Sequence, residues 1–169
     1  MPTIEPTIEL KLERLFADTK LPERKTEGSA GYDVHAYVLE HTVQVIRRDS
    51  TLEMRRNKED YFLLTSRARA LISLGFKATF TPGFEAQIRP RSGRAWSDGL
   101  QILNSPGTID SDYPGEWKVL VFNPTQTNIK IGHGERIAQV VFNRMETVRI
   151  EEFGVQQVTD RTGGFGSTG

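Results

Sequence analysis

Apolar and polar side chains alternate along several short stretches of the chain. In residues 7–13 three apolar residues are separated by charged ones, and in residues 84–90 Ala86 and Ile88 share one face while charged and amide side chains share the other. A period of two predicts half-buried β-strands. Further β-rich runs are residues 30–37, 61–64, 70–74, 118–122, 136–142 and 148–153.

Helical periodicity is absent over any long window, and Pro–Gly turns separate the β-rich runs. We therefore predict an all-β sandwich or barrel with a short helix at residues 94–100, for which Ser92 is available as a cap. Residues 1–160 are expected to form a single domain, and residues 161–169 a Gly-rich C-terminal arm. A charged segment at about 41–60 is interpreted as a solvated hairpin or loop, with a protein-binding role as the alternative.

Composition narrows the class of protein. The 169 residues suit one domain with a single core, and Lys+Arg and Asp+Glu both number 22, so no overall field attracts nucleic acid or a membrane surface. The chain has no cysteine, which excludes disulfides and thiolate zinc sites. It has no signal pattern and no apolar run of membrane-spanning length, so we expect a soluble, cytoplasmic protein.

Residues 104–118 hold the most concentrated candidate chemistry. Two turns, Pro106-Gly107 and Pro114-Gly115, enclose Asp110, Asp112 and Tyr113. Because Pro fixes φ and Gly admits positive φ, we expect a short, rigid hairpin that aims the carboxylate of Asp110 as a general base. The alternative is a surface turn whose acids bond only to their own backbone.

Two other places suit an anionic ligand. Arg91-Ser92-Gly93 at a helix start offers a guanidinium, a hydroxyl and backbone N–H groups, although a plain helix cap has the same sequence. Gln139 shares the strand face of Ile137 and Val141, so its amide needs a partner that is either structural or a ligand with its water.

The last nine residues are rich in glycine and contain one aromatic residue, Phe165. A frayed tail is one interpretation. The other is an arm in which Phe165 stacks on a base while Gly163, Gly164 and Gly166 let backbone N–H groups approach phosphate and Arg161 adds charge.

These features occur together in one known family, because the chain resembles the trimeric dUTPases. All five family motifs appear in order: Ala30 to Ala36; Pro90-Arg91-Ser92-Gly93; Gly107 to Glu116; Gly134 to Gln139; and Gly163 to Gly169. The resemblance implies a distorted jelly-roll subunit, a homotrimer with active sites between subunits, and hydrolysis of dUTP to dUMP and pyrophosphate. Such an activity keeps uracil out of DNA and supplies dUMP for dTMP synthesis.

The resemblance also implies a role for individual residues. Asp110 would activate the attacking water, Asn104 would read the uracil edge, and Tyr113 would pack under the deoxyribose. Asp33 would hold the water shell of a Mg²⁺ clamped by the triphosphate. Further substrate contacts are implied for Arg91, Ser92, Gly93, Gly107, Thr108, Ile109, Lys118, Gln139, Arg161, Phe165, Gly166 and Ser167. Only Thr162 separates Arg161 from the Gly-Gly-Phe-Gly run, one residue fewer than the family usually has, so the reach of Arg161 is shifted.

Three rival functions are open. A dCTP deaminase shares the fold but uses a glutamate in the strand that here reads Lys118 to Phe122 without an acid. A nucleotide-switched module could bind a protein through residues 41–60. A nucleic-acid-binding β-barrel is disfavoured by zero net charge. His35, His41 and His133 lack ligand spacing and are interpreted as surface or packing residues.

Overall fold

The computed structural model describes residues 7–152 and residue 154. Within them the chain is nearly all β, with a single α-helix, α1 (Ser92–Ser97). The strands are β1 (Leu10–Arg14), β2 (Tyr32–His35), β3 (Thr42–Ile46), β4 (Leu52–Arg56), β5 (Tyr61–Leu64), β6 (Arg69–Phe80), β7 (Phe84–Pro90), β8 (Gln101–Ile102), β9 (Gly107–Asp110), β10 (Glu116–Phe122), β11 (Ile129–Gly132) and β12 (Arg136–Arg144).

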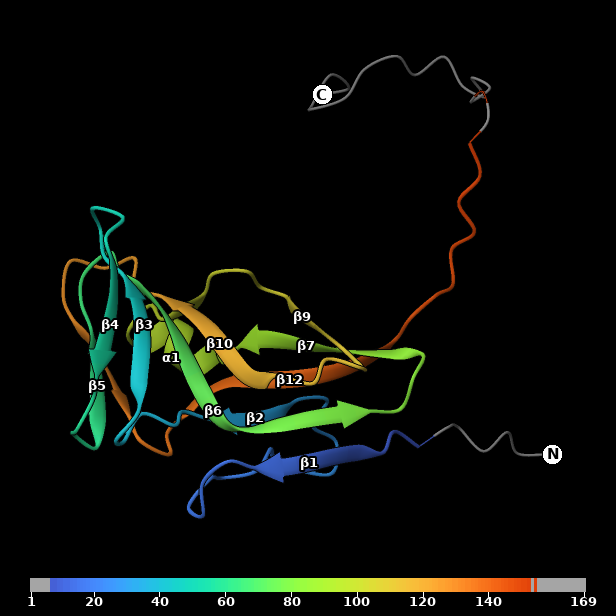
Figure 1. The fold of residues 1–169 in the computed structure, drawn as a ribbon, viewed down its shortest axis with the longest axis horizontal. Helices are drawn as coiled ribbons and strands as arrows, with labels where there is room; N and C mark the ends of the chain where they lie inside the picture. The colour runs from blue at the N-terminus through green and yellow to red at the C-terminus, as the bar shows by residue number, and fades with distance from the viewer. Residues whose placement is uncertain (1–6, 153, 155–169) are drawn as a thin grey trace.

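The strands form a jelly roll of antiparallel sheets (Figure 1). A six-stranded sheet has the order β4-β3-β6-β10-β8, and β1 also pairs with β6. A four-stranded sheet has the order β2-β12-β7-β9, and β5 pairs with β11. The predicted all-β class is confirmed. No helix in the described part of the chain is long and apolar enough to cross a membrane.

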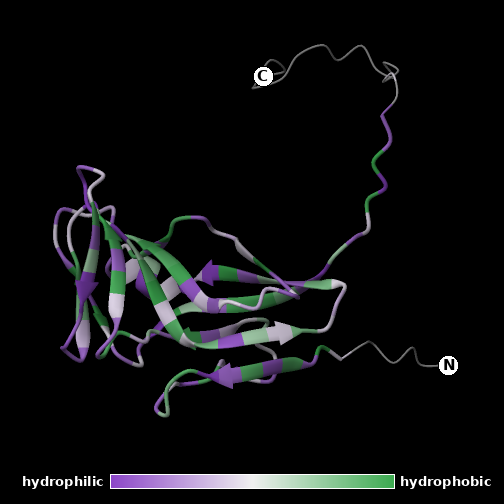
Figure 2. Ribbon diagram, in the orientation of Figure 1, coloured by the Kyte–Doolittle hydropathy of each residue, from purple (hydrophilic) through white to green (hydrophobic). Residues whose placement is uncertain are grey.

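The core lies between the sheets and is built by the alternation seen in the sequence. In β7, Ala86 and Ile88 are buried while Glu85, Gln87 and Arg89 face away, as predicted. Figure 2 shows the same change of polarity from residue to residue along the strands. Trp117 is fully buried, and its Nε1 donates to the carbonyl of Ala78 at 3.1 Å, so the indole N–H is satisfied inside the core.

The stretch between the two Pro–Gly turns differs from the expected hairpin. β9 pairs with β7 and β10 pairs with β6, so the two strands belong to different sheets. The connection between them therefore crosses from one layer to the other. Its tip is fixed by a backbone hydrogen bond from Phe80 to the carbonyl of Ser111, at 3.2 Å. The sequence identified the turns but not the strands with which each side would pair.

The charged segment at 41–60 forms the hairpin β3–β4 and its flanking loops. β3 also pairs with β6, and its Val43 and Val45 are buried in the core. β4 lies at the edge of the six-stranded sheet and exposes Leu52 and Met54. β3 thus contributes side chains to the core, whereas β4 faces solvent.

The strand expected at residues 148–153 is not formed by residues 148–152, and residue 153 lies outside the described part of the chain. Residues 145–152 have no regular structure and leave the body as an extended chain (Figure 1). Val148 is 74% exposed and Ile150 88% exposed. A strand requires a partner for its backbone groups, and none of the described strands pairs with this segment.

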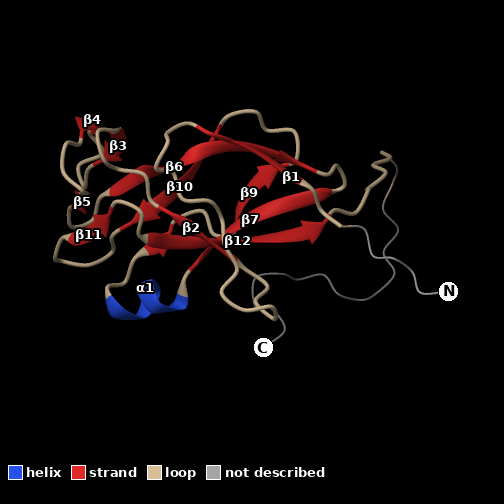
Figure 3. Cartoon of the chain, turned by 90° about the horizontal axis from the view of Figure 1, so that it is seen from below, coloured by secondary structure: helices blue, strands red, loops and turns tan. Residues whose placement is uncertain are grey.

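The short helix is confirmed, but it begins earlier than predicted. Arg91 is its N-cap residue, in extended conformation, and Ser92 is the first helical residue, so the Ser92 side chain makes no cap hydrogen bond. Figure 3 shows α1 on the outside of the molecule, and none of its residues is buried.

Candidate functional site

An aspartate between two arginines forms the centre of the anionic-ligand half of the site. The Arg91 Nε donates to Asp33 Oδ1 at 2.9 Å, and the Arg136 Nη1 donates to Asp33 Oδ2 at 2.9 Å. The Arg91 Nη1 also donates to the backbone carbonyl of Arg136 at 3.1 Å. One carboxylate thus fixes two guanidinium groups that come from different strand ends, and a positive charge remains in excess.

Arg136 was not identified as a site residue from the sequence. The signal was available, because Arg136 lies inside the motif that runs from Gly134 to Gln139. What the sequence did not show is the antiparallel pairing of β12 with β2, which brings Arg136 to the acid of β2.

Gln139 lies beside this cluster and shares a face of β12 with Val141, as predicted, but not with Ile137. A register irregularity between Arg136 and Ala138 places Ile137 in the core and turns Gln139 outward. Its Nε2 donates to the Pro90 carbonyl at 2.8 Å, which is the structural partner that its amide needed. Its Oε1 lies over Gly31, where a Cβ would approach it to 2.1 Å.

A cavity of about 340 Å³ opens between these elements. Its lining includes Gly31, Asp33, Arg89, Gln139 and Lys25. Three of these residues lie in one row across the sheet, because Gln139 is paired with Asp33 on one side and with Arg89 on the other. The row offers cationic and amide donors to an oxyanion.

Ser92 and Gly93 border the same region at the start of α1. Both are exposed, and a Cβ at Gly93 would meet nothing within 4 Å. The Ser92 hydroxyl is not used as a helix cap. It is therefore available to donate to a ligand.

Asp110 ends β9 and is exposed, directly after the half-buried Ile109. β9 is held by the backbone pairing of Gly107, Thr108 and Ile109 with β7. The Tyr113 N–H donates to the Asp110 carbonyl at 3.2 Å and closes the turn. The Asp110 carboxylate therefore projects from a strand end whose backbone is fixed on both sides.

Two glycines let side chains fold across this turn. The Asn104 amide lies over Gly107, where a Cβ would be 3.0 Å from its Nδ2. The Tyr113 ring lies over Gly115, where a Cβ would be 2.3 Å from the phenolic oxygen. Tyr113 is 44% exposed and presents an aromatic surface beside Asp110.

Lys118 follows on β10 and pairs with Glu116 at 3.2 Å. Glu116 also accepts a hydrogen bond from the Ser73 hydroxyl. The Lys118 side chain is thus held by the acid on its own strand, and its backbone remains the part that borders the turn.

The two halves of the site lie far apart in a single chain. Asp110 is paired with Glu85, at the far end of β7 from Arg91. Six residues of strand separate these positions, which is on the order of 20 Å. Hydrogen bonds connect the two ends along β7, from Arg89 to Gln87 at 2.6 Å and from Gln87 to Glu85 at 2.6 Å. A ligand that touches both Asp110 and Arg91 therefore requires a second copy of the chain.

The donor set suits a metal that is carried mainly by a ligand. The described residues contain no group of three His, Cys, Asp or Glu side chains that could hold a metal ion. Mg²⁺ prefers oxygen and retains several waters, often with only one or two carboxylates beside substrate phosphates. A carboxylate has about four lone-pair positions. Asp33 can therefore accept from metal-bound water while it keeps both arginines.

Four of the predicted substrate contacts, Arg161, Phe165, Gly166 and Ser167, lie outside the described residues. They therefore stay predictions.

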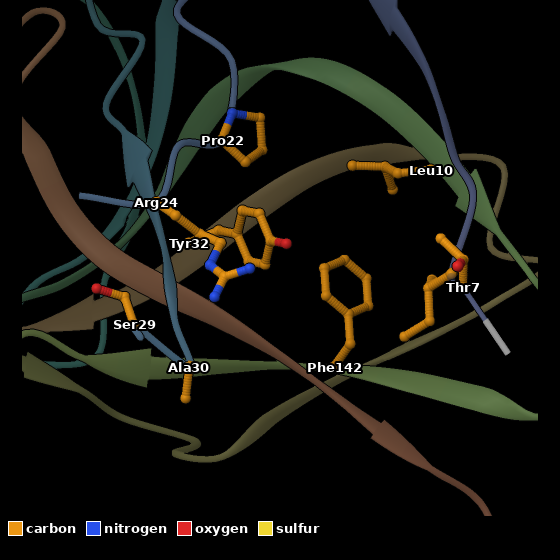
Figure 4. A pocket seen from close by; sticks show the side chains of 9 residues that line it. Thr7, Leu10, Pro22, Arg24, Ser29, Ala30, Tyr32 and Phe142 are labelled. Carbon is orange, nitrogen blue, oxygen red and sulfur yellow. The ribbon is translucent and has the colours of Figure 1, made fainter. Parts of the chain in front are cut away.

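A second and larger cavity, of about 450 Å³, lies between β1 and the four-stranded sheet (Figure 4). Tyr32 and Phe142 meet there edge to face at 6.0 Å, and the Arg24 guanidinium lies 5.6 Å from the Tyr32 ring. The predicted site residues are absent from its lining. The larger cavity is therefore not the one that brings the predicted site residues together.

Comparison with known proteins gives the family. The dUTPase family model matches residues 48–169. The deoxyuridine 5'-triphosphate nucleotidohydrolase of Rhizobium rhizogenes is 43% identical over 152 residues, which cover 88% of this chain and 85% of that protein. That of Thermoanaerobacter sp. is 41% identical, covering 90% of each chain.

Two solved structures have the same fold. The dUTPase of Staphylococcus bacteriophage 80alpha, solved with dUPNHPP, superposes with a TM-score of 0.72 at 21% identity and covers 95% of this chain and 98% of its own. A mutant dUTPase from phage phi11 of S. aureus, described with a structural Mg(II) ion, has a TM-score of 0.69 at 17% identity and covers 88% of this chain and 99% of its own. Because the dUTPase family model matches most of this chain, residues 48–169, the chain belongs to the dUTPase family.

Proposed function

We propose that this chain hydrolyses dUTP to dUMP and pyrophosphate, by attack of water on the α-phosphorus. The observation that carries the proposal is that one chain of the dUTPase family has both an arginine cluster bound to Asp33 and, apart from it, a carboxylate on a fixed strand end, Asp110. In-line phosphoryl chemistry requires both parts, charge neutralisation at the phosphates and a base for the water.

Arg91 binds the triphosphate, with the Ser92 hydroxyl and the Gly93 backbone completing the contact. Arg136 keeps Asp33 in place and so orients Arg91 before substrate arrives. Gln139 donates to phosphate or to ordered water from the same row. Preorganised donors of this kind stabilise the charge that develops on the leaving pyrophosphate, because they need no rearrangement during the reaction.

Asp110 orients the attacking water and takes its proton. The Asn104 amide and the backbone of residues 107–118 read the uracil edge, and a cytosine leaves these polar groups unpaired. Tyr113 lies under the deoxyribose, where the 2′-hydroxyl of a ribonucleotide would collide with the ring. Together these contacts select dUTP from the other pyrimidine nucleotides.

Mg²⁺ is the cofactor, held mainly by the substrate phosphates, and it supplies Lewis-acid stabilisation of the phosphate oxygens when bound. Asp33 is the residue of this chain that would accept hydrogen bonds from its waters. Because both carboxylate oxygens of Asp33 already accept hydrogen bonds from arginines, we assign Asp33 to the metal's water shell and not to direct coordination.

The active enzyme is a homotrimer with sites between subunits. The separation of Asp110 from Arg91 within one chain supports this assembly, because both residues act on the triphosphate of one dUTP, whereas about 20 Å of strand lies between them in a single chain. The arm at 161–169 closes the site, with Phe165 over the uracil and Gly166, Ser167 and Arg161 at the phosphates. We place the enzyme in the cytoplasm, with its nucleotide substrate.

A product assay tests the proposal. Pyrophosphate and ammonia are measured with dUTP, dCTP, dTTP and UTP in the presence of Mg²⁺. We expect pyrophosphate from dUTP alone and no ammonia from dCTP. Ammonia release would instead identify a deaminase, and the absence of any product from all four nucleotides would support a non-catalytic nucleotide-binding module.

A further inference from the structure

Helix α1 carries proposed phosphate contacts, yet apolar packing does not hold it in place. None of its six residues is buried within the described part of the chain, and Trp96 is 93% exposed. A helix this short is not stable without tertiary contacts. Arg94 is the one residue of α1 that the described chain shields, with a side chain that is 11% exposed. The contacts of Arg94 therefore decide how α1 lies on the protein.

The Arg94 guanidinium has three partners among the described residues. It forms ion pairs with Asp98, at 2.9 Å, and with Glu135. Its Nη2 also donates to the backbone carbonyl of Lys130 at 3.1 Å. Asp98 is the C-cap residue of the same helix, whereas Lys130 lies on β11 and Glu135 in the turn that follows β11. Two of the three contacts thus join α1 to another element.

Glu135 is held in place independently of Arg94. Its Oε2 accepts from the Gly132 N–H at 2.7 Å, and its own N–H donates to the Gly132 carbonyl at 3.2 Å. Its carbonyl accepts from the Ala36 N–H at 2.8 Å, directly after β2. Both the side chain and the backbone of Glu135 are therefore fixed, and α1 is tied to a rigid part of the fold.

The ion pair between Arg94 and Glu135 lies next to the phosphate half of the site. Arg91, one helical turn before Arg94, donates from its Nη1 to the Arg136 carbonyl at 3.1 Å. Arg94 pairs with the preceding residue, Glu135. The first turn of α1 is thus attached at two points to the start of β12. Ser92 lies between these points in the chain, so the position of its hydroxyl depends on both attachments.

The charge of Arg94 is matched where it lies. Burial lowers the pKa of the Arg94 guanidinium, but an arginine keeps its proton at neutral pH. A shielded charge must be paired, and removal of one partner leaves the other uncompensated. The planar fork of a guanidinium can bind two acids and a carbonyl at once, which the point charge of a lysine does not do.

We propose that Arg94 is a positioning residue: its ion pair with Glu135 holds α1 so that the Ser92 hydroxyl meets the triphosphate. The inference rests on the proposed hydrolysis of dUTP. The described residues that line the cavity of about 340 Å³ do not include Arg94, so Arg94 acts through α1 and not on the substrate. Asn104 follows β8, which is paired with β10, so the nucleoside contacts do not depend on the position of α1.

The first test compares two ligands. Binding of a non-hydrolysable dUTP analogue and of deoxyuridine, which has no phosphate, is measured by calorimetry for the full chain and for Arg94→Met. The variant keeps an unbranched side chain and removes all three contacts. We expect the affinity for the analogue to fall at least about tenfold, because a displaced contact group no longer meets its phosphate. The affinity for deoxyuridine should stay the same, whereas damage to the whole fold would weaken both ligands.

Arg55→Met is the matched control. Arg55 also binds an acid and a backbone carbonyl, Glu53 at 3.1 Å and Leu63 at 3.2 Å, but it does so from the β3–β4 hairpin. The loss of an arginine with these contacts should leave both affinities unchanged.

Glu135→Gln tests the same ion pair from the other side, and it keeps the inference testable if Arg94→Met does not fold. The amide oxygen of the new side chain can still accept from the Gly132 N–H, but the negative charge beside Arg94 is gone. We expect a loss of analogue affinity in the same direction. The double variant should lose no more than Arg94→Met alone, since both changes break one pair. Additive losses would contradict the role of the pair.

Hydrogen exchange tests the position of α1 without any nucleotide. The Ala95 N–H donates to the Arg91 carbonyl at 3.0 Å, and the Leu100 N–H donates to the Arg94 carbonyl at 3.2 Å. Both amides should exchange at least about tenfold faster in Arg94→Met than in the unsubstituted chain, because α1 has lost its main attachment. The amides of β6 should keep their rates.

Equal analogue affinity for Arg94→Met and the unsubstituted chain would overturn the inference, as would equal losses for both ligands or unchanged exchange in α1. Faster exchange without a loss of analogue affinity would also overturn it, since α1 would then move without effect on the phosphates. An unsubstituted chain that binds no analogue and releases no pyrophosphate would instead contradict the proposed function.

Discussion

Arg91 and Asp33 are 58 positions apart in the sequence, yet the Arg91 Nε donates a hydrogen bond of 2.9 Å to the Asp33 carboxylate. Both side chains are largely shielded, at 24% and 14% exposure. This ion pair fixes the orientation of the Arg91 guanidinium before a ligand binds.

Asp33→Asn should therefore lower the free energy of unfolding by about 2 kcal/mol and weaken nucleotide binding by at least about tenfold. It leaves Arg91 and Arg136 without their shared counter-charge. Thermal unfolding and titration with a non-hydrolysable dUTP analogue would measure the two effects. Glu40→Gln, which breaks the exposed pair with Arg56, serves as the control and should change stability by less than about 0.5 kcal/mol.

Asp110→Asn should bind dUTP with nearly unchanged affinity and reduce kcat by about 100-fold or more, because removal of a general base costs that much. Single-turnover assays of pyrophosphate release separate the chemical step from binding. Asp112→Asn is the matched control, since Asp112 is a similarly exposed acid in the same turn. Near-normal turnover by Asp110→Asn would refute its assignment as the base.

Gly115→Ala should impair selection against ribonucleotides while the fold persists. The added Cβ would lie 2.3 Å from the phenolic oxygen of Tyr113, so the exposed ring must swing away from the turn. We expect the ratio of kcat/KM for dUTP over UTP to fall by at least about tenfold. Gly28→Ala, whose Cβ would meet nothing within 4 Å, should leave this ratio unchanged.

Glu53 provides a pH-dependent test of the hairpin. Hydrogen bonds from Arg47 and then Arg55 lower the pKa of Glu53 to about 2. A carboxyl whose pKa is depressed in the folded state stabilises the protein at pH above its ordinary pKa of 4.5, and this contribution is lost as the pH falls toward 2. NMR titration of the Glu53 side chain should give a midpoint near 2.

The variant Glu53→Gln is the control, because it has no carboxyl group to titrate at this position. Its free energy of unfolding should fall less between pH 4.5 and pH 2 than that of the unsubstituted chain. Identical acid-unfolding curves for the two proteins would show that the contacts of Glu53 with Arg47 and Arg55 are not maintained in solution.

Removal of residues 161–169 should abolish most dUTP hydrolysis. The number of chains in the assembly should stay the same. A closing arm excludes water and completes the phosphate contacts, whereas assembly depends on the body of the protein. Phe165→Ala should also weaken substrate binding. An unchanged kcat for the truncated chain would show that the arm has no catalytic role.

The local rules in the sequence were sufficient for much of the fold. Period-two alternation located β1 and β7, and the Pro–Gly pairs located the turns around Asp110. Ser92 was misjudged as a cap because the helix begins at Ser92 itself, with Arg91 as the N-cap residue. The helix begins two residues earlier than predicted, and a shift of this size is decided by hydrogen bonding, which propensity does not specify.

The sequence by itself determined the strand-forming segments, the rigid turn that carries Asp110 and the five family motifs, because each depends on neighbouring residues. Tertiary structure alone decided which strands pair. It moved β9 and β10 into different sheets, turned Gln139 outward at an irregularity in β12, and joined Arg136 to Asp33 across 103 positions. Pairing between distant strands is set by long-range packing and register, and these are physical quantities that no short stretch of sequence contains.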